Sequence, residues 1–191
     1  MGRVSQAQAE ENRRRVVDTA SRLFREQGTH VSVADLMKAA GLTHGAFYKQ
    51  FASKEALVDE ATTHAFDEQS RRHAVGLERY EGQRDTAQRA LIDAYLSVEH
   101  RDDAADGCPV AALAVDVARG GEGREARRAY TEGVADFAAF LAPADASGGS
   151  EEGIARLCTL FGALVLSRAT QGSPLSEEIL AAAHATLTKT G

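Results

Sequence analysis

The sequence has few cysteines, few prolines and no long apolar run. Its two cysteines, Cys108 and Cys158, are far apart, which excludes a disulfide framework and a metal-binding cysteine pair. Three prolines among 191 residues, together with abundant Ala, Leu, Glu and Arg, predict an all-α chain. No apolar stretch approaches the roughly 20 residues that a membrane-spanning helix needs, so we expect no membrane partner.

Signals of secretion and of catalysis are also missing. The segment MGRVSQAQAEENRRR lacks the apolar region of a secretory signal, and we expect a cytoplasmic protein. The six histidines show no metal-ligand spacing, and no phosphate-binding glycine loop or Ser–His–acid grouping stands out. We therefore expect no metal, no cofactor and no catalytic residue. The enzyme alternative is a thiol hydrolase, which would require the fold to bring Cys108 to His100.

The net charge of −6 is unevenly distributed along the chain. Residues 1–54 contain nine Lys and Arg against five Asp and Glu, a balance of +4, whereas residues 55–191 have a balance of −10. Phosphate binding needs a local cationic surface more than a cationic whole. The overall acidity is therefore compatible with a DNA-binding N-terminal segment.

A first long helix is predicted from about Asn12 to Gln27, after a frayed terminus. Its apolar residues recur at helical spacing and form one stripe, made of Val16, Val17, Ala20, Leu23 and Phe24. We expect its arginines to lie mostly outside, namely Arg13, Arg14, Arg15, Arg22 and Arg25. This helix would bury the back of the next two helices, which are too short to exclude water alone.

Residues 32–54, SVADLMKAAGLTHGAFYKQFASK, predict two short helices joined by a tight turn. In the first helix Val33, Leu36 and Met37 recur at i, i+3 and i+4 on one face, after Ser32 as a good N-cap. Gly41 suits the left-handed conformation that ends many helices.

The second helix is predicted over about residues 44–50, with Thr43 as its cap. In that helix Phe47 and Phe51 can point inward, while Thr43, His44, Lys49 and Gln50 stay outside. Two helices with polar donors on the exposed half of the second are typical of a helix-turn-helix.

The run AGLTHGAFYKQFASKEAL resembles the recognition segment of the tetracycline-repressor (TetR) family of bacterial transcriptional regulators. The glycine, aromatic and lysine positions of that segment all fall in register. The matching residues are Gly41, Leu42, Thr43, His44, Gly45, Ala46, Phe47, Tyr48, Lys49, Gln50, Phe51, Ser53, Lys54 and Glu55. The resemblance covers only roughly residues 12–58. It therefore does not identify the effector that regulates the protein.

The resemblance implies a three-helix DNA-binding domain over residues 1–53 and a larger helical ligand-binding and dimerisation domain over residues 54–191. About nine helices are expected in all. The resemblance further implies a homodimer that binds a palindromic operator in double-stranded DNA, as a repressor rather than an activator. A small-molecule effector would release it by shifting the population of dimers toward another spacing of the two DNA-binding domains.

The candidate DNA-binding residues lie between Ser32 and Lys54. Hydroxyl groups of Thr43 and Tyr48 can donate to phosphate oxygens, although Tyr48 could instead pack against the first helix. By the resemblance, Lys54 binds a phosphate beside a helix N-terminus. The remaining candidates are base-reading His44, Lys49 and Gln50, the small residues Gly45 and Ala46, and Ser32. The family often has His and Tyr where Lys49 and Gln50 stand, which suggests a different operator.

Six helices are expected after the recognition segment, over about residues 54–75, 87–96, 109–117, 124–141, 154–171 and 174–187. The intervening loops include residues 101–107 and 143–153. By the resemblance, the last two helices pair across a two-fold axis. The same helical body is expected to hold the effector, with candidate lining residues Tyr95, Cys108, Phe137, Phe161 and Arg168, each of which could otherwise be a core or surface residue.

Two alternatives to effector binding remain open. Cys108 precedes Pro109 at a helix start, where the helix dipole favours a thiolate, so it could sense oxidants or electrophiles rather than simply pack. Cys158, in the most apolar helix, is expected to pack. In the second alternative, the helix-turn-helix is an adaptor that binds protein and shows no salt-dependent DNA binding.

Overall fold

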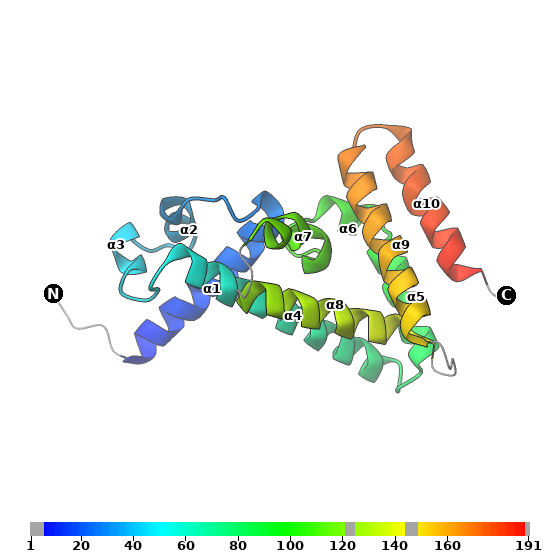
Figure 1. Cartoon of the computed structure of the whole chain (residues 1–191), viewed down its shortest axis with the longest axis horizontal. Coiled ribbons are helices and arrows are strands. Elements are labelled where there is room, and N and C mark those ends of the chain that lie inside the picture. The colour runs from blue at the N-terminus through cyan, green and yellow to red at the C-terminus, as the bar shows by residue number, and fades with distance from the viewer. Residues whose placement is uncertain (1–5, 121–124, 144–148, 190–191) are drawn as a thin grey trace.

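Ten α-helices and no strand make up the part of the chain that the structure describes, a computed structural model of residues 6–120, 125–143 and 149–189. The helices are α1 (Gln6–Gln27), α2 (Val33–Ala39), α3 (His44–Phe47), α4 (Lys54–Arg79), α5 (Arg84–Tyr95), α6 (Val98–Asp102), α7 (Pro109–Arg119), α8 (Glu125–Leu141), α9 (Gly149–Ala169) and α10 (Pro174–Thr188) (Figure 1). The all-α prediction is therefore confirmed. None of these helices is long and apolar enough to cross a bilayer.

The turn between α2 and α3 closes as the sequence predicts. The Ser32 hydroxyl accepts a hydrogen bond from Asp35 N at 3.1 Å and so caps α2. Gly41 has a φ of 70°, a conformation that a side chain would strain. Leu42 N then donates to Met37 O at 2.8 Å, which pairs a carbonyl that the helix end leaves free. These contacts fix the direction in which α3 leaves α2.

One hydrophobic cluster joins α1–α3 to two later helices. Phe24 of α1, Met37 of α2 and Phe47 of α3 are fully buried in it, together with Leu57 of α4 and Leu113 of α7. Burial of such large side chains is the main favourable term for short helices like α2 and α3. Because α4 and α7 complete this cluster, the division of the chain at residue 53 stays a prediction.

A second cluster lies among α4–α10 and extends away from the first. Its most extensive helix contacts are α4 with α8, α8 with α9, and α9 with α10. Figure 1 shows α4 and α8 side by side along the long axis of the molecule, with α1–α3 at one end and α9–α10 at the other. The α4–α8 pair is thus the structural link between the two ends.

Several segments differ from the predictions, and two of the differences are at helix ends: α3 ends at Phe47 rather than near residue 50, and α4 continues to Arg79 rather than ending near residue 75. Helix α1 begins at Gln6 rather than Asn12, because residues 6–11 are Gln, Ala and Glu, all good helix formers. Helix α6 occupies part of the expected loop 101–107; the Ser97 hydroxyl caps it by accepting from His100 N at 3.1 Å. Helix α9 begins at Gly149, inside the expected loop 143–153, of which residues 144–148 lie outside the described residues.

Substitution of Gly133 tests the α4–α8 contact. A Cβ at Gly133 would lie 2.0 Å from the buried Phe66 ring, so Gly133→Ala should destabilise the fold by roughly 1–3 kcal/mol. Gly76→Ala in α4 is the control, since a Cβ there meets no atom within 4 Å and should stabilise by roughly 0.5–1 kcal/mol. Urea unfolding measures both, and a Gly133→Ala protein as stable as wild type would contradict this packing.

Candidate functional site

The outward face of α3 is the first candidate site. Phe47 is fully buried and stacks on Phe51 at 5.4 Å between ring centroids, whereas the next side chain, Tyr48, is 67% exposed. The His44 ring meets the Tyr48 ring edge-on at 5.6 Å. A short helix anchored by two phenylalanines therefore holds polar and aromatic side chains in solvent.

The predicted DNA-binding residues fall into two groups by exposure. Exposed residues are Ser32, Thr43, His44, Gly45, Tyr48 and Lys49, and half-buried residues are Ala46, Gln50 and Lys54. Thr43 begins α3 without a side-chain capping bond, so capping does not occupy its hydroxyl. The Ser32 hydroxyl, in contrast, caps α2 and donates to the Asp35 carboxylate at 2.6 Å.

Arg13 is half-buried and connects the end of the α3 segment to α1 and α4. Its guanidinium lies 4.4 Å from the Phe51 ring centroid and donates to Gln50 O and to the Glu60 carboxylate. A cation over an aromatic face is attracted by the ring quadrupole. Arg13 is thus a structural bridge from α1 to the end of the α3 segment and to α4.

A cavity of about 350 Å³ between α4, α5, α7 and α8 is the second candidate site. Three of the five predicted lining residues border it, namely Tyr95, Cys108 and Phe137. The other two do not. Phe161 packs against the second hydrophobic cluster, the one among α4–α10. Arg168 donates hydrogen bonds to backbone carbonyls of α6.

Burial sets the protonation of the groups in this cavity. It raises the pKa of the Cys108 thiol, which disfavours the open alternative of a thiolate sensor and agrees with a packing role. It also raises the pKa of Tyr95 well above the usual value. Burial and then the nearby Arg72 lower the pKa of His73 to about 4, and the His73 ring stacks on Phe140 at 4.6 Å. His73 is therefore neutral at pH 7.

The loop between α6 and α7, residues 103–108, forms one wall of the cavity and is bound by arginines of α1 and α4. Arg25 of α1 donates to Gly107 O at 3.2 Å, and Arg72 of α4 donates to Asp106 O at 2.8 Å. Arg22 of α1 pairs with the Asp106 carboxylate. The wall of the cavity is thus attached directly to α1.

Arg25 was wrongly predicted to lie outside, and it is the residue that the sequence reasoning missed. It is 5% exposed and also pairs with Glu68 of α4 at 3.2 Å. Its position gives a signal, because Val17, Ser21 and Arg25 follow one another at i, i+4 and i+8 on the buried face of α1. A charged residue on an apolar face indicates a specific buried partner.

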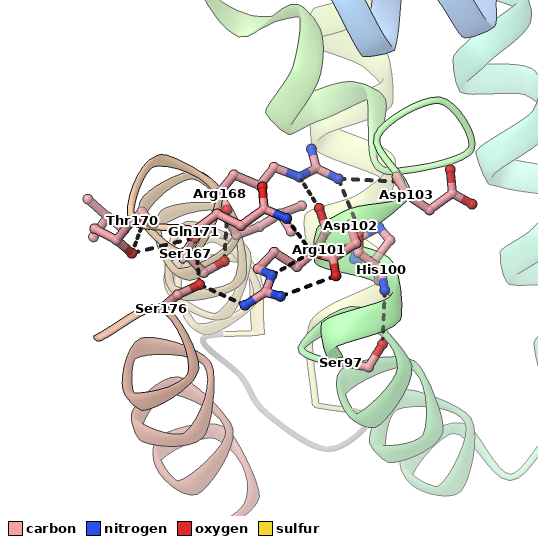
Figure 2. A network of polar contacts seen from close by, with 12 residues as sticks. Ser97, His100, Arg101, Asp102, Asp103, Ser167, Arg168, Thr170, Gln171 and Ser176 are labelled. Carbon is pink, nitrogen blue, oxygen red and sulfur yellow. Dashed lines mark hydrogen bonds and ion pairs between the residues drawn. The ribbon is translucent and has the colours of Figure 1, made fainter. Parts of the chain in front are cut away.

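The C-terminal half of α6 is tied to α9 and α10, as Figure 2 shows. Arg168 of α9 donates to Arg101 O at 3.0 Å and to His100 O at 3.1 Å. Arg101 of α6 donates to the Ser176 hydroxyl at 2.8 Å, which in turn donates to Ser167 O at 2.7 Å. This network fixes α6 and the start of the following loop relative to the C-terminal helices.

One face of α9 exposes apolar side chains. Ile154, Cys158 and Val165 follow at i, i+4 and i+11, and all three are exposed. The prediction that Cys158 packs is therefore wrong for the single chain, because its side chain points away from the core. Among the described residues, no group of three or more His, Cys, Asp or Glu could hold a metal ion.

Comparisons with known proteins match the N-terminal helices and the whole fold. The family model for bacterial regulatory proteins of the tetR family matches residues 16–61. The HTH-type transcriptional regulator AcrR of Shigella flexneri is 41% identical over 61 residues, which are 31% of this chain and only 28% of AcrR.

Two solved structures are similar over nearly the entire chain. The reduced form of E. coli NemR superposes with a TM-score of 0.77 at 20% identity, over 93% of this chain and 95% of NemR. A TetR-family regulator from Cytophaga hutchinsonii gives 0.76 at 16% identity, over 99% and 100%. At these identities the likeness shows the fold.

Replacement of His73 tests whether burial in the cavity lowers the pKa of this side chain. The pKa of His73 is lowered, so the unfolded chain binds this proton near pH 6.5 while the folded chain does not until about pH 4. The neutral His73 therefore makes its full contribution to the free energy of unfolding above pH 6.5. Roughly 1–2 kcal/mol of that contribution is lost when the pH falls to 5. Urea unfolding at pH 7.5 and pH 5 should show a smaller loss for His73→Phe than for wild type; equal losses would contradict it.

Proposed function

This chain belongs to the tetR family of bacterial regulatory proteins, and we propose that it is a homodimeric transcriptional repressor, released from a palindromic operator by a small molecule. It would act in the cytoplasm, where the bacterial chromosome lies. The observation that supports operator binding most directly is the exposed Tyr48 above the buried Phe47, inside the segment that matches the family.

In the proposed complex α3 lies in the major groove. Tyr48, Thr43 and Lys54 bind phosphates, and the positive balance of residues 1–54 draws them to the DNA backbone. The side chains of His44, Lys49 and Gln50 read base edges, while Gly45 and Ala46 allow the backbone to approach. Ser32 acts at the start of α2, through the cap that its hydroxyl makes.

A dimer is proposed because one reading helix of four residues contacts too few base pairs. The exposed face of α9 around Ile154, Cys158 and Val165 offers apolar surface for a second copy, and α10 packs beside it. Burial of this face across a two-fold axis would remove apolar area from water. It would also cover Cys158.

Release by an effector is proposed to act through the α6–α7 loop. A molecule in the cavity would press on residues 106–108, and Arg25 and Arg22 join that wall to α1. The effector would bind more tightly when α1–α3 have one orientation than when they have another, and so would favour that orientation. Such a difference in affinity is what coupling between two sites requires. The raised pKa of Cys108 disfavours the alternative in which its thiolate is the sensor.

Selection of bound sequences from random duplex DNA, repeated across a salt series, tests operator binding. The proposal expects a palindromic consensus and an affinity that falls as salt rises. Protein unfolded and refolded before the assay controls for a retained ligand. If the refolded protein also enriches no sequence, the adaptor alternative replaces the proposal.

Three substitutions separate backbone binding from base reading. Tyr48→Phe and Lys54→Ala should each weaken binding to all sequences, and Lys54→Ala should make the salt dependence shallower by about one unit of slope, because a cation at the phosphates is lost. Lys49→Ala should relax base preference at one position per half-site, with roughly 1–3 kcal/mol lost on the consensus. Fluorescence anisotropy on the consensus and its single-base variants measures both; uniform loss for Lys49→Ala would refute its base contact.

Charge on the exposed face of α9 tests the dimer. Val165→Glu would place carboxylates in the proposed interface and should shift the protein to monomers in sedimentation-velocity runs at micromolar concentration. Val75→Glu on α4 is the matched control, because Val75 is 61% exposed and lies outside that face. A dimeric Val165→Glu protein would contradict this interface.

A further inference from the structure

Two polar atoms of the cavity lack hydrogen-bond partners. The Tyr95 hydroxyl and the Gln69 side-chain carbonyl are both buried at residues that line the cavity, and neither has a nitrogen or oxygen partner; the hydroxyl lies beside the Cys108 thiol, which is only a weak hydrogen-bonding group. Tyr95 is only 7% exposed. Buried polar groups are nearly always paired, so an unpaired donor at a cavity wall points to a ligand that supplies the acceptor.

The charges around this cavity favour an acidic ligand. Arg25, Arg72 and Arg79 line it, and the only carboxylate among the described lining residues, Asp106, already pairs with Arg22. Glu68 is shared by Arg25 at 3.2 Å and Arg72 at 2.7 Å. Four guanidinium groups thus face two carboxylates, and a buried cation would add to this excess positive charge.

The N-terminus of α7 adds to the positive potential in the cavity. Cys108 is the N-cap of this helix and Pro109 its first residue, and both line the cavity close to Tyr95. A helix N-terminus has a partial positive charge that stabilises anions. The unpaired hydroxyl and the helix end therefore lie at the same part of the wall.

The remaining walls are aromatic and close together. His73 lies between Phe137 and Phe140, at 4.7 and 4.6 Å between ring centroids, and Tyr95 lies 6.1 Å from Phe137. At about 350 Å³ the cavity is near the lower end of small-molecule sites. Such walls suit a flat ring system of one or two rings, which can stack or meet them edge-on.

We propose that the effector is a compact aromatic carboxylate, whose acid group accepts a hydrogen bond from the Tyr95 hydroxyl beside α7 and whose rings lie against Phe137 and Phe140. The inference rests on the proposed effector control of this cavity. It adds the ligand's charge and shape, which exclude cationic aromatic compounds.

Calorimetric titration of the full-length protein with three naphthalene probes tests the ligand's charge. The probes are 2-naphthoate, 2-naphthamide and 2-naphthylmethylammonium, which share a ring system and differ in charge. At pH 7.5 the naphthoate should bind about tenfold more tightly than the amide, because a charge-assisted bond is roughly twice as strong as a neutral one. The ammonium probe should not bind. Equal or tighter binding of the ammonium probe, or no binding of naphthoate at millimolar concentration, overturns the proposal.

Two tyrosine variants test the hydrogen bond. Tyr95→Phe keeps the ring and removes an unpaired hydroxyl, so it should weaken naphthoate binding about tenfold while thermal stability stays equal or rises. Tyr130→Phe is the control, because the Tyr130 hydroxyl lies outside the cavity lining and donates to Val110 O at 2.8 Å. It should lower stability and leave naphthoate affinity unchanged. Undiminished naphthoate affinity in Tyr95→Phe overturns the contact.

Operator affinity separates this inference from the function on which it rests. One outcome is that naphthoate binds through Tyr95 while the affinity of the protein for the selected operator is the same with and without naphthoate. In that case the ligand class stands and effector control fails. If the operator is bound but the three probes bind alike, operator binding stands and the ligand class fails.

Discussion

The loop between α6 and α7 is held in place by arginine side chains that donate to its backbone carbonyls. Arg25 reaches it from α1, Arg72 from α4 and Arg168 from α9, so one short segment is bound to helices from both ends of the molecule. Gly107 permits this approach, because a Cβ there would lie 2.8 Å from the Arg168 guanidinium and from Asp103 O. Charge-assisted bonds are stronger than neutral ones, and the bond from Arg25 to Gly107 O is buried as well, so these arginines hold the loop in place as a wall.

That wall serves two sites at once. One side of it closes the cavity at Gly107 and Cys108, and the other side meets α1, whose Phe24 belongs to the cluster that anchors α3 through Phe47. Thr29 N also donates to the Asp116 carboxylate of α7 at 2.7 Å, which adds a second tie at the end of α1. Packed elements of this kind move as units. A shift of the cavity wall would therefore be passed to the exposed face of α3 through α1 and the hydrophobic cluster alone.

The exposed face of α3 could be predicted because its signals are local. The Ser32 cap, the left-handed Gly41 and the inward Phe47 and Phe51 all depend on near neighbours in the chain. The cavity could be predicted only in part. Arg25 bonds to Gly107, 82 residues away, and no periodicity within α1 identifies such a partner. The choice between a thiolate sensor and a packing residue at Cys108 could not be made from the sequence, because it depends on burial, a property of the tertiary fold that raises the pKa of the thiol.

Amide hydrogen exchange, with and without the selected operator at saturation, tests coupling through the loop most directly. Coupling is reciprocal, so an effector site that acts on DNA binding must itself respond to DNA. Slower exchange should then appear at the amides of residues 103–108 as well as in α2 and α3, with α10 as the internal reference. If operator DNA protects α2 and α3 while exchange in residues 103–108 stays the same, the loop does not connect the two sites.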